Sequence, residues 1–428
     1  MMRILVTGIY GFIASQITGT LRAAGHTIIG CVRDVAKAKK RFPDLEMIEC
    51  DFRKDTDPYI WLPRIQPVDA IVNCVGVLQS SKPEEIEAIH FKTPHALFEA
   101  CQIAHKRIIH FSALGADAGV DTLYAKTKYA LEKYVSTLDG DWIILRPSMV
   151  YGTGSYGGTS LFRALAAIPW IIPVVGKGSQ EFQPIHIRDI AKTVLTLLEK
   201  KEITKKTINV VGPEKITLEQ LLVTLRQWLG FNGAKIIHIP LSIMKPFAKL
   251  GDWFSDIPIN STSFKMLSYS NTADPKPFIE TLGFNPVSID KSLLENPSST
   301  QDRWHARIYF LNPLLRIALG LLWLLSGILP LLVAQEVLSI LTKVGFSTIW
   351  AELLFYASCG IDILLGFATL FNYRLKWTGS IQLILIIFYT LFISIFLPEY
   401  WLDPFGSIVK NIPILVATLF MMALSDPR

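Results

Sequence analysis

The stretch that most constrains the fold is Arg3–Ala14, which reads RILVTGIYGFIA. A short apolar run leads into two glycines three positions apart, and a helical pattern of apolar residues follows through Ile17 and Leu21. A strand, a tight turn and a helix N-terminus cradle an anion, because the first helical amides have no acceptor within the helix. The stretch predicts a phosphate-binding turn, although a strand–turn–helix that merely contains glycines fits the same pattern.

Length and composition divide the chain into unlike parts. At 428 residues it is long enough for two or three domains, and its apolar excess is concentrated after about residue 305. The net charge of +6 is spread without a dense basic block, which argues against nucleic-acid binding. The chain begins directly with the predicted strand, so we expect no signal peptide and a cytoplasmic N-terminal part.

The five cysteines show no CxxC pair and no metal-ligand spacing, and we expect no metal site. They fall mostly in apolar runs. We therefore expect reduced thiols in the protein core, as in a cytosolic protein. The five are Cys31, Cys50, Cys74, Cys101 and Cys359.

Strands and helices alternate through the first 150 residues. Further strands are expected at 27–32, 46–50, 70–74 and 107–111, with a helix at about 92–105 before the last of them. This order predicts an α/β fold with a doubly wound parallel sheet and right-handed crossovers. Ligands of such sheets lie beyond the carboxyl ends of the strands, where this chain places Arg33, Asp51, Asn73 and Ser112.

Arg33 lies about twenty residues past the glycine turn, where the ribose of a dinucleotide is recognised. An arginine there accommodates the 2′-phosphate of NADP, whereas an acid favours NAD. Because Asp34 follows directly, we expect NADP and keep NAD as the alternative. Asp51 is an expected acceptor for the adenine amino group, and the backbone from Asn73 to Gly76 is expected to pass beside the cofactor.

Tyr124 and Lys128 are four residues apart on an expected helix and so share one face. A nearby ammonium stabilises a tyrosinate and lowers the phenol pKa, which would let Tyr124 act as a general acid or base. Ser112, twelve residues before Tyr124, would hold the substrate carbonyl or hydroxyl. A surface Tyr–Lys pair is the plain alternative.

Together these motifs resemble the extended or atypical branch of the short-chain dehydrogenase/reductase superfamily. Residues 110–116 and 124–132 are similar to the group that contains the nucleotide-binding accessory subunit of respiratory complex I. The resemblance covers about residues 1–290 and implies a Rossmann-type sheet with a small C-terminal substrate lobe. It implies catalytic Ser112, Tyr124 and Lys128, and a cofactor site of Thr7, Gly8, Tyr10, Gly11, Phe12, Ile13, Arg33, Asp51, Asn73, Gly76 and Lys128. Members of that group can bind NADPH without evident turnover, so the motifs alone do not imply catalysis.

The expected NAD(P)-binding domain spans 1–295, with its substrate lobe mainly at 147–295. A Thr217-Leu-Glu-Gln220 pattern predicts a capping box that opens an amphipathic helix. His186 is expected to be structural, and the lobe shows no recognisable sugar or lipid signature. Residues 296–306 are polar, lack apolar periodicity and are expected to form a linker.

The remaining residues, 307–428, contain four apolar segments close to the ~20 residues that cross a bilayer as a helix. They lie at about 314–333, 350–371, 377–397 and 408–424. Basic residues precede the first segment and separate the second from the third, so both ends and the middle loop are expected on the cytoplasmic side. This predicts a multi-pass protein of the cell (inner) membrane with its nucleotide-binding domain facing the cytoplasm.

The pattern Pro398-x-x-Trp401-x-Asp403-Pro-Phe-Gly406 makes this region similar to the DoxX-like membrane family, a four-helix transmembrane module. Polar groups inside membrane spans are costly and mark function or pairing. Asp362 falls near the middle of the second segment, and an ion pair with Arg316 is expected. A quinone-linked or proton-linked role for that pair, and the role of Lys410, remain open.

The sequence thus favours a membrane-anchored NAD(P)H-dependent oxidoreductase that moves hydride to or from a carbonyl, an alcohol or a quinone-like substrate. Tethering to membrane lipid suggests a lipidic substrate. One alternative is a non-catalytic NADP(H)-binding subunit with partners in a membrane complex. Another is an epimerase or dehydratase acting on a lipid-linked sugar, which the short Ser112–Tyr124 spacing disfavours.

Overall fold

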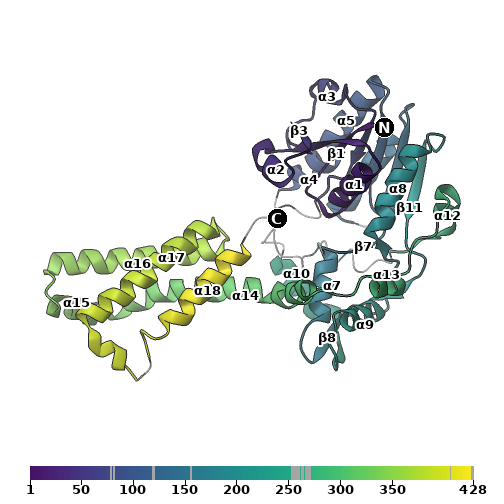
Figure 1. Ribbon diagram of the computed structural model, residues 1–428. Helices are drawn as coiled ribbons and strands as arrows, with labels where there is room; N and C mark the ends of the chain where they lie inside the picture. The colour runs from purple at the N-terminus through teal and green to yellow at the C-terminus, as the bar shows by residue number, and fades with distance from the viewer. Residues whose placement is uncertain are drawn as a thin grey trace. The chain divides into compact units, whose positions relative to one another are not determined.

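The computed structural model divides the chain into two compact units, Met1–Ala306 and Arg307–Arg428 (Figure 1). Each unit is described here by itself. The structure describes residues 1–77, 80, 82–117, 121–154, 157–251, 261, 265, 271–404 and 406–425.

The first unit is built on a parallel seven-stranded sheet with the order β11-β6-β5-β4-β1-β2-β3. Its strands are β1 (Arg3–Thr7), β2 (Thr27–Val32), β3 (Glu46–Glu49), β4 (Ala70–Asn73), β5 (Arg107–Phe111), β6 (Trp142–Pro147) and β11 (Lys206–Val210). The expected doubly wound sheet is confirmed. Its strand order reverses between β1 and β4, and a crevice at the carboxyl ends of such strands is where open α/β sheets bind ligands.

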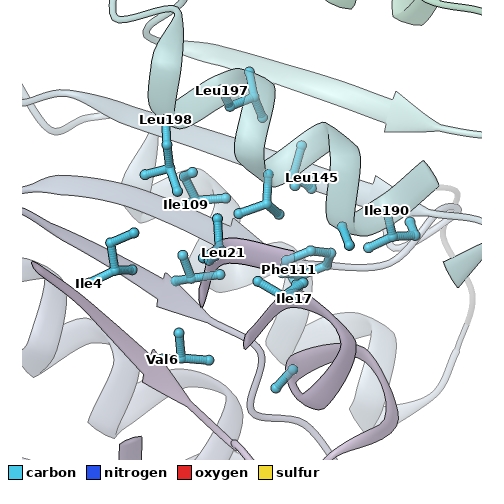
Figure 2. Close-up of a cluster of buried hydrophobic side chains, with 14 of the residues drawn as sticks. Ile4, Val6, Ile17, Leu21, Ile109, Phe111, Leu145, Ile190, Leu197 and Leu198 are labelled. Atoms are coloured by element: carbon cyan, nitrogen blue, oxygen red, sulfur yellow. The ribbon is translucent and has the colours of Figure 1, made fainter. Parts of the chain in front are cut away.

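Helices cover both faces of the sheet because side chains alternate along each strand. Ile4 and Val6 of β1 point to the face covered by α1 (Phe12–Ala23) and α8 (Ile187–Glu199), whose apolar side chains interdigitate there (Figure 2). Leu5 points to the opposite face. That face is covered by α3 (Pro58–Ile65), α5 (Thr93–Ile103) and α6 (Leu123–Val135).

Shorter elements complete the first unit. Those between the strands are α2 (Val35–Arg41), α4 (Pro83–Glu87) and the π-helix η1 (Ala88–Lys92), which runs directly into α5. The small lobe holds β7 (Val150–Tyr151), α7 (Gly158–Ala166), β8 (Ile171–Val175), β9 (Glu181–Phe182), β10 (Ile185–His186), β12 (Ile216–Thr217), α9 (Leu218–Trp228), β13 (Lys235–Ile239), α10 (Leu241–Gly251), α12 (Lys276–Leu282) and α13 (Ile289–Glu295). The capping box expected at Thr217 and Gln220 opens α9.

Helix α14 (Thr300–Ile328) begins inside the linker expected at 296–306. The Ser299 hydroxyl accepts from the Asp302 amide at 3.1 Å, and the Ser299 amide donates to the Asp302 carboxylate at 2.9 Å, which is the reciprocal bonding of a capping box. Asp302 also pairs with the buried Arg163 at 3.0 Å, and Ala306 is buried in the core of the small lobe. The polar side chains of Ser299 and Asp302 therefore form a helix cap, and Asp302 also forms an ion pair.

The second unit is helical. After α14 it contains the 3₁₀ turn η2 (Leu329–Val333), α15 (Ala334–Lys343), α16 (Thr348–Leu370), α17 (Leu375–Phe396), the 3₁₀ turn η3 (Pro398–Leu402) and α18 (Asn411–Leu424). Among the described residues, three helical stretches are long and apolar enough to cross a membrane, with mean hydropathies of 2.4, 1.8 and 2.2. They are Thr300–Lys343, Thr348–Leu370 and Leu375–Phe396. The fourth apolar segment forms a helix of 14 residues, shorter than the span expected at 408–424.

Inside this unit, Asp362 is buried and accepts a hydrogen bond from the Tyr389 hydroxyl at 3.2 Å. This hydrogen bond links α16 and α17, and the ion pair expected between Asp362 and Arg316 stays a prediction. Glycines let the neighbouring helices approach, because a Cβ on Gly366 would come within 2.7 Å of the Leu324 amide nitrogen.

Candidate functional site

The glycine turn lies between β1 and α1, beside the end of β4. Gly8 has a φ of +69°, and a Cβ there would stand 3.2 Å from the Val75 side chain, so both conformation and space require glycine. The Gly11 amide closes the turn on the Gly8 carbonyl at 2.7 Å, and Gly11 begins α1 without a capping side chain. The first amides of α1 are therefore free of capping groups, as an anion cradle needs.

Other residues expected at the cofactor pack around this turn. Tyr10 stacks its ring at 5.9 Å from Phe42, and Phe12 and Ile13 are partly buried against the core at the start of α1. Their place next to the turn fits a cofactor cradle.

Thr7 and Asn73 end two adjacent strands, and their side chains bond to each other. The Thr7 hydroxyl donates to Asn73 Oδ1 at 2.6 Å and accepts the Cys74 amide at 3.3 Å. The Asn73 amide group lies 3.1 Å from His110 Nδ1. Thr7, Asn73 and His110 are all fully buried, so the bonds between their side chains fix the strand ends.

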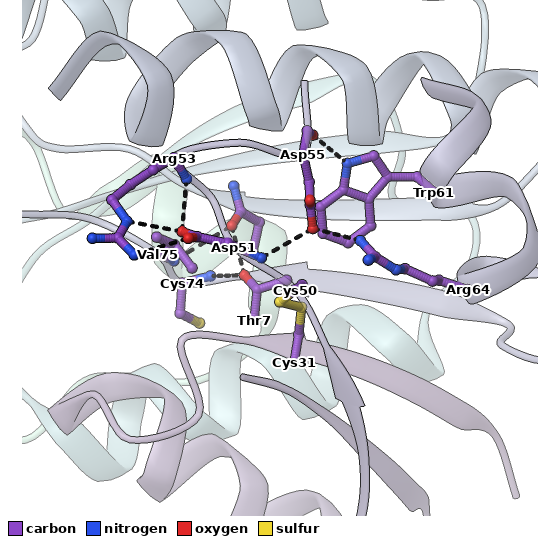
Figure 3. The surroundings of a disulfide bond; sticks show 11 residues. Thr7, Cys31, Cys50, Asp51, Arg53, Asp55, Trp61, Arg64, Cys74 and Val75 are labelled. Atoms are coloured by element: carbon purple, nitrogen blue, oxygen red, sulfur yellow. Dashed lines mark hydrogen bonds and ion pairs between the residues drawn. A yellow bond between two sulfur atoms is a disulfide. The ribbon is translucent and has the colours of Figure 1, made fainter. Parts of the chain in front are cut away.

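The expected ribose and adenine contacts lie at the ends of β2 and β3. Arg33 is exposed, and its charge contributes to lowering the pKa of Asp51. The main cause of that lower pKa is Arg53, whose guanidinium donates to both Asp51 oxygens, at 3.0 and 2.8 Å (Figure 3). Asp34 instead caps α2 by accepting the Lys37 amide at 2.8 Å. Two arginines thus stand where sequence reasoning found one, and Arg53 was visible only as a residue two positions after Asp51.

Two of the five cysteines form a disulfide, which corrects the expectation of reduced thiols. Cys31 near the end of β2 is bonded to Cys50, which follows β3, with their Cα atoms 5.9 Å apart (Figure 3). The two strands are neighbours in the sheet, where Cys31 is in register with Ile48. Sequence alone could not show this pairing, because it depends on strand order. Cys74, Cys101 and Cys359 are free thiols.

Ser112, Tyr124 and Lys128 come from the end of β5 and from α6. Lys128 is buried and donates from Nζ to the Phe111 carbonyl at 2.8 Å, so α6 is docked onto the residue that precedes Ser112. A second, longer bond of 3.4 Å reaches the Val75 carbonyl after β4. Ser112 is buried, and its hydroxyl has no hydrogen-bond partner among the described residues. An unsatisfied buried hydroxyl is available to a ligand.

The electrostatics of this group differ from the expectation. Burial raises the pKa of Tyr124 to about 12. Burial also lowers the pKa of Lys128 to about 8, with Cys74 and Glu132 acting in the opposite direction. Burial thus raises the pKa of Tyr124, in the direction opposite to the expected lowering by Lys128.

Two histidines complete the description. His186 caps α8 by accepting the Arg188 amide at 3.3 Å and packs edge-on against Tyr151 at 5.1 Å, so its expected structural role is confirmed. His90 was missed by sequence reasoning. It is buried within η1 and contacts the ring of Tyr124 at 5.2 Å. Apolar periodicity does not reveal a π-helix, so no sequence signal placed His90 at the site.

Comparisons with known proteins agree with the fold of the chain. A model of the NAD dependent epimerase/dehydratase family matches residues 4–212, and a model of the DoxX-like family matches residues 320–419. The NADH-ubiquinone oxidoreductase 40 kDa subunit of Neurospora crassa is 23% identical over 250 residues, which are 57% of this chain and 64% of that protein. The ceramide reductase of Caulobacter vibrioides is 28% identical over 123 residues, 29% of this chain and 38% of that protein.

Among solved structures, a UDP-glucose 4-epimerase from Thermotoga maritima has a TM-score of 0.53 at 18% identity, covering 68% of this chain and 96% of that one. This likeness shows the fold. With the curated relatives the match is partial, and the chain spans less than two thirds of the length of the first ones it matches.

Proposed function

For a chain that joins an NAD-dependent epimerase/dehydratase-family domain to a DoxX-like domain, we propose a membrane-anchored, NADPH-dependent reductase of a lipidic carbonyl substrate. The reverse reaction on a secondary alcohol uses the same groups. The observation that carries the proposal is that Lys128 on α6, four residues after Tyr124, bonds to the carbonyl of Phe111 next to Ser112 and to that of Val75 next to the glycine turn.

Each residue has a role that its surroundings support. The Ser112 hydroxyl, buried and without a partner, holds the substrate oxygen. Tyr124 donates a proton from its hydroxyl to that oxygen as the alcohol forms. Lys128 holds the end of β5 and the loop after β4 together. A bound NADPH supplies the hydride.

The residues present fit a dinucleotide. Gly8 and Gly11 keep the turn free of side chains where a pyrophosphate would lie against the helix N-terminus. Arg33 and Arg53 supply positive charge at the ribose end, and Arg53 neutralises the Asp51 carboxylate that would repel a 2′-phosphate. This arrangement supports NADP over NAD, since guanidinium groups suit phosphate.

A lipidic substrate is supported by the second unit. Its apolar helices are long enough to hold the enzyme at a bilayer, and their outer side chains, such as Leu364 at 69% exposure, are apolar. A relative named ceramide reductase acts, by its name, on a lipid. We place the protein in the cell membrane with its nucleotide-binding domain in the cytoplasm, on the evidence of the basic residues that flank the apolar segments.

The experiment uses the full chain purified in detergent. Its bound nucleotide is identified by mass spectrometry, and NADPH oxidation is followed with panels of lipidic carbonyls and quinones. Wild type should oxidise NADPH with at least one carbonyl lipid, and Tyr124→Phe should lower kcat by about 100-fold or more, since the loss of a general acid costs at least about 100-fold. NADPH that binds tightly but is oxidised by no acceptor would refute the reductase.

A second candidate is a non-catalytic NADP(H)-binding subunit of a membrane complex. The observation that favours it is the raised pKa of Tyr124. The similarity to an NADH-ubiquinone oxidoreductase subunit points the same way. In that case Tyr124→Phe has no effect in cells, whereas loss of nucleotide binding destabilises the partner complex. An epimerase or dehydratase of a lipid-linked sugar would instead return its nucleotide to the starting redox state after each turnover.

A further inference from the structure

His90 sits in the π-helix η1, whose extra residue per turn changes the direction of the side chains that follow. Its side chain is 1% exposed, and the imidazole lies between the loop after β4 and helix α6. π-helical turns inside longer helices are costly and are found frequently at functional sites. The π-helical turn therefore indicates a role for His90 at the site.

The hydrogen bonds of His90 assign its tautomer. The Val77 amide donates to Nε2 at 3.0 Å, so Nε2 is an acceptor and carries no proton. Burial and the charge of Lys128 lower the pKa of His90 to about 2, so the ring is neutral at physiological pH. The proton must then be on Nδ1, which donates to the Thr127 hydroxyl at 3.1 Å. Thr127 in turn donates to the Leu123 carbonyl at 2.8 Å, and the chain of donors is complete.

The imidazole of His90 also contacts the ring of Tyr124, the proposed proton donor. Its ring meets the Tyr124 ring edge to face, with centroids 5.2 Å apart and planes at 83°. It also flanks Gly76, since a Cβ on that glycine would stand 3.7 Å from His90 Nε2 and 3.6 Å from Lys128 Nζ. His90 thus contacts the loop expected to pass the cofactor and the helix that carries Tyr124.

We propose that His90 is a positioning residue, which as the neutral Nδ1–H tautomer holds the Tyr124 ring and the Val77 loop in the geometry for proton transfer. This inference rests on the proposed reductase function for its kinetic consequences. His90 itself exchanges no proton with substrate, because both of its ring nitrogens are occupied by protein groups. Its effect is exerted through Tyr124.

A misplacement of about 1 Å in a reacting group can cost about 100-fold in rate without loss of binding. We therefore expect His90→Phe, which keeps a ring but loses both hydrogen bonds, to lower kcat by about 10- to 100-fold. The dissociation constant for NADPH should change by less than about threefold, since no cofactor-binding side chain is altered. Unchanged kcat in a folded His90→Phe protein would overturn the proposal.

Two conservative variants separate the two anchors. Glutamine places its side-chain oxygen near the position of Nε2 and can accept from Val77, whereas asparagine places its amide nitrogen near Nδ1 and can donate to Thr127. Each should restore part of the kcat lost in His90→Phe. His95→Phe is the matched control, since His95 lies on the same helical segment, stacks on Tyr134 and should leave kcat unchanged.

Thr127→Val guards against a His90 variant that does not fold. It keeps the shape of Thr127 and removes the acceptor for Nδ1–H, so kcat should fall in the same direction. The double variant His90→Phe/Thr127→Val should be little slower than His90→Phe alone. Both changes break the same hydrogen bond, between His90 Nδ1 and the Thr127 hydroxyl. Fully additive losses would contradict a shared role.

Nitrogen NMR of the full chain labelled at histidine tests the inference without any substrate. For His90, Nδ1 should be the protonated ring nitrogen. Its signal should disappear in His90→Phe and move in Thr127→Val. A protonated Nε2, or fast averaging of the two nitrogens, would overturn the inference. If wild type shows this signal but no turnover with any acceptor, the reductase function fails while the positioning of Tyr124 by His90 stands.

Discussion

Lys128 is a buried cation of the proposed site. It is 4% exposed, and its ammonium is held by the carbonyls of Phe111 and Val75 with no carboxylate in direct contact in the part of the chain that is described. Burial lowers its pKa from 10.5 to about 8. The protein thus keeps a buried cation near its point of titration, which stability alone would not favour.

This predicts a pH dependence of stability. Below pH 8 the lysine is protonated in both folded and unfolded chains, whereas between pH 8 and 10.5 only the unfolded chain retains the proton. Stability rises with pH wherever the unfolded state binds more protons, so wild type should gain stability relative to Lys128→Met across this window. Thermal unfolding of both proteins in one detergent measures it. A difference that is constant from pH 7 to 10 would show that Lys128 is not desolvated.

Arg33 and Arg53 lie at the same end of the cofactor site but have different surroundings. Arg33 is exposed at the end of β2, whereas the guanidinium of Arg53 donates two hydrogen bonds to the Asp51 carboxylate. Arg33→Ala should weaken NADPH binding by about tenfold or more and NADH binding by less than about threefold, because a hydrogen bond to a charged group is worth about 1.5–3 kcal/mol. Fluorescence titration with both nucleotides measures the two losses. Equal losses would show that Arg33 does not contact the 2′-phosphate.

At the scale of elements, the disulfide joins β2 to the chain just after edge strand β3, directly before Asp51. The bond closes a loop with a sequence separation of 19, for which chain entropy predicts about 3 kcal/mol of stabilisation. A reductant, or the pair Cys31→Ser/Cys50→Ser, should therefore lower the unfolding midpoint. Mass spectrometry after alkylation under non-reducing conditions should find three modified cysteines. Five modified cysteines in the native protein would show that the bond does not form.

The elements that sequence reasoning found are those with strong local signals. Strands 27–32 and 107–111 have the bounds that periodicity predicted, because buried parallel strands are short apolar runs between turn residues. The helix start at Thr300 was missed because Ser299 and Asp302 form a cap whose polar residues look like a linker. Local patterns specify elements, while caps are recognised only with the helix that follows.

The candidate site divides in the same way. Gly8, Ser112, Tyr124 and Lys128 could be identified because each occupies a fixed place after a strand or on a helix face. Other features arise from contacts between distant segments, and no pattern in the sequence encodes them. These are the Cys31–Cys50 bond and the tautomer of His90.

At the scale of the whole molecule, the first unit has its own apolar cores on both sides of its sheet and in its small lobe. The second unit exposes apolar side chains along helices long enough to span a bilayer. The full chain should therefore remain with membranes after an alkaline carbonate wash, whereas a chain ending at Ala306 should be released. Fractionation followed by immunodetection measures both. Release of the full chain would contradict the assignment of membrane spans.

We propose that the protein is anchored in a membrane and moves hydride from NADPH to a lipidic carbonyl with Tyr124 as the proton donor. The most direct test supplies NADPH deuterated at C4 of the nicotinamide to the full chain in vesicles of its own membrane lipids. Mass spectrometry of the lipid fraction should then show an alcohol heavier by one deuterium, and Tyr124→Phe should form it about 100-fold more slowly. A lipid fraction without deuterium, from a protein that binds NADPH and is folded, would contradict the claim.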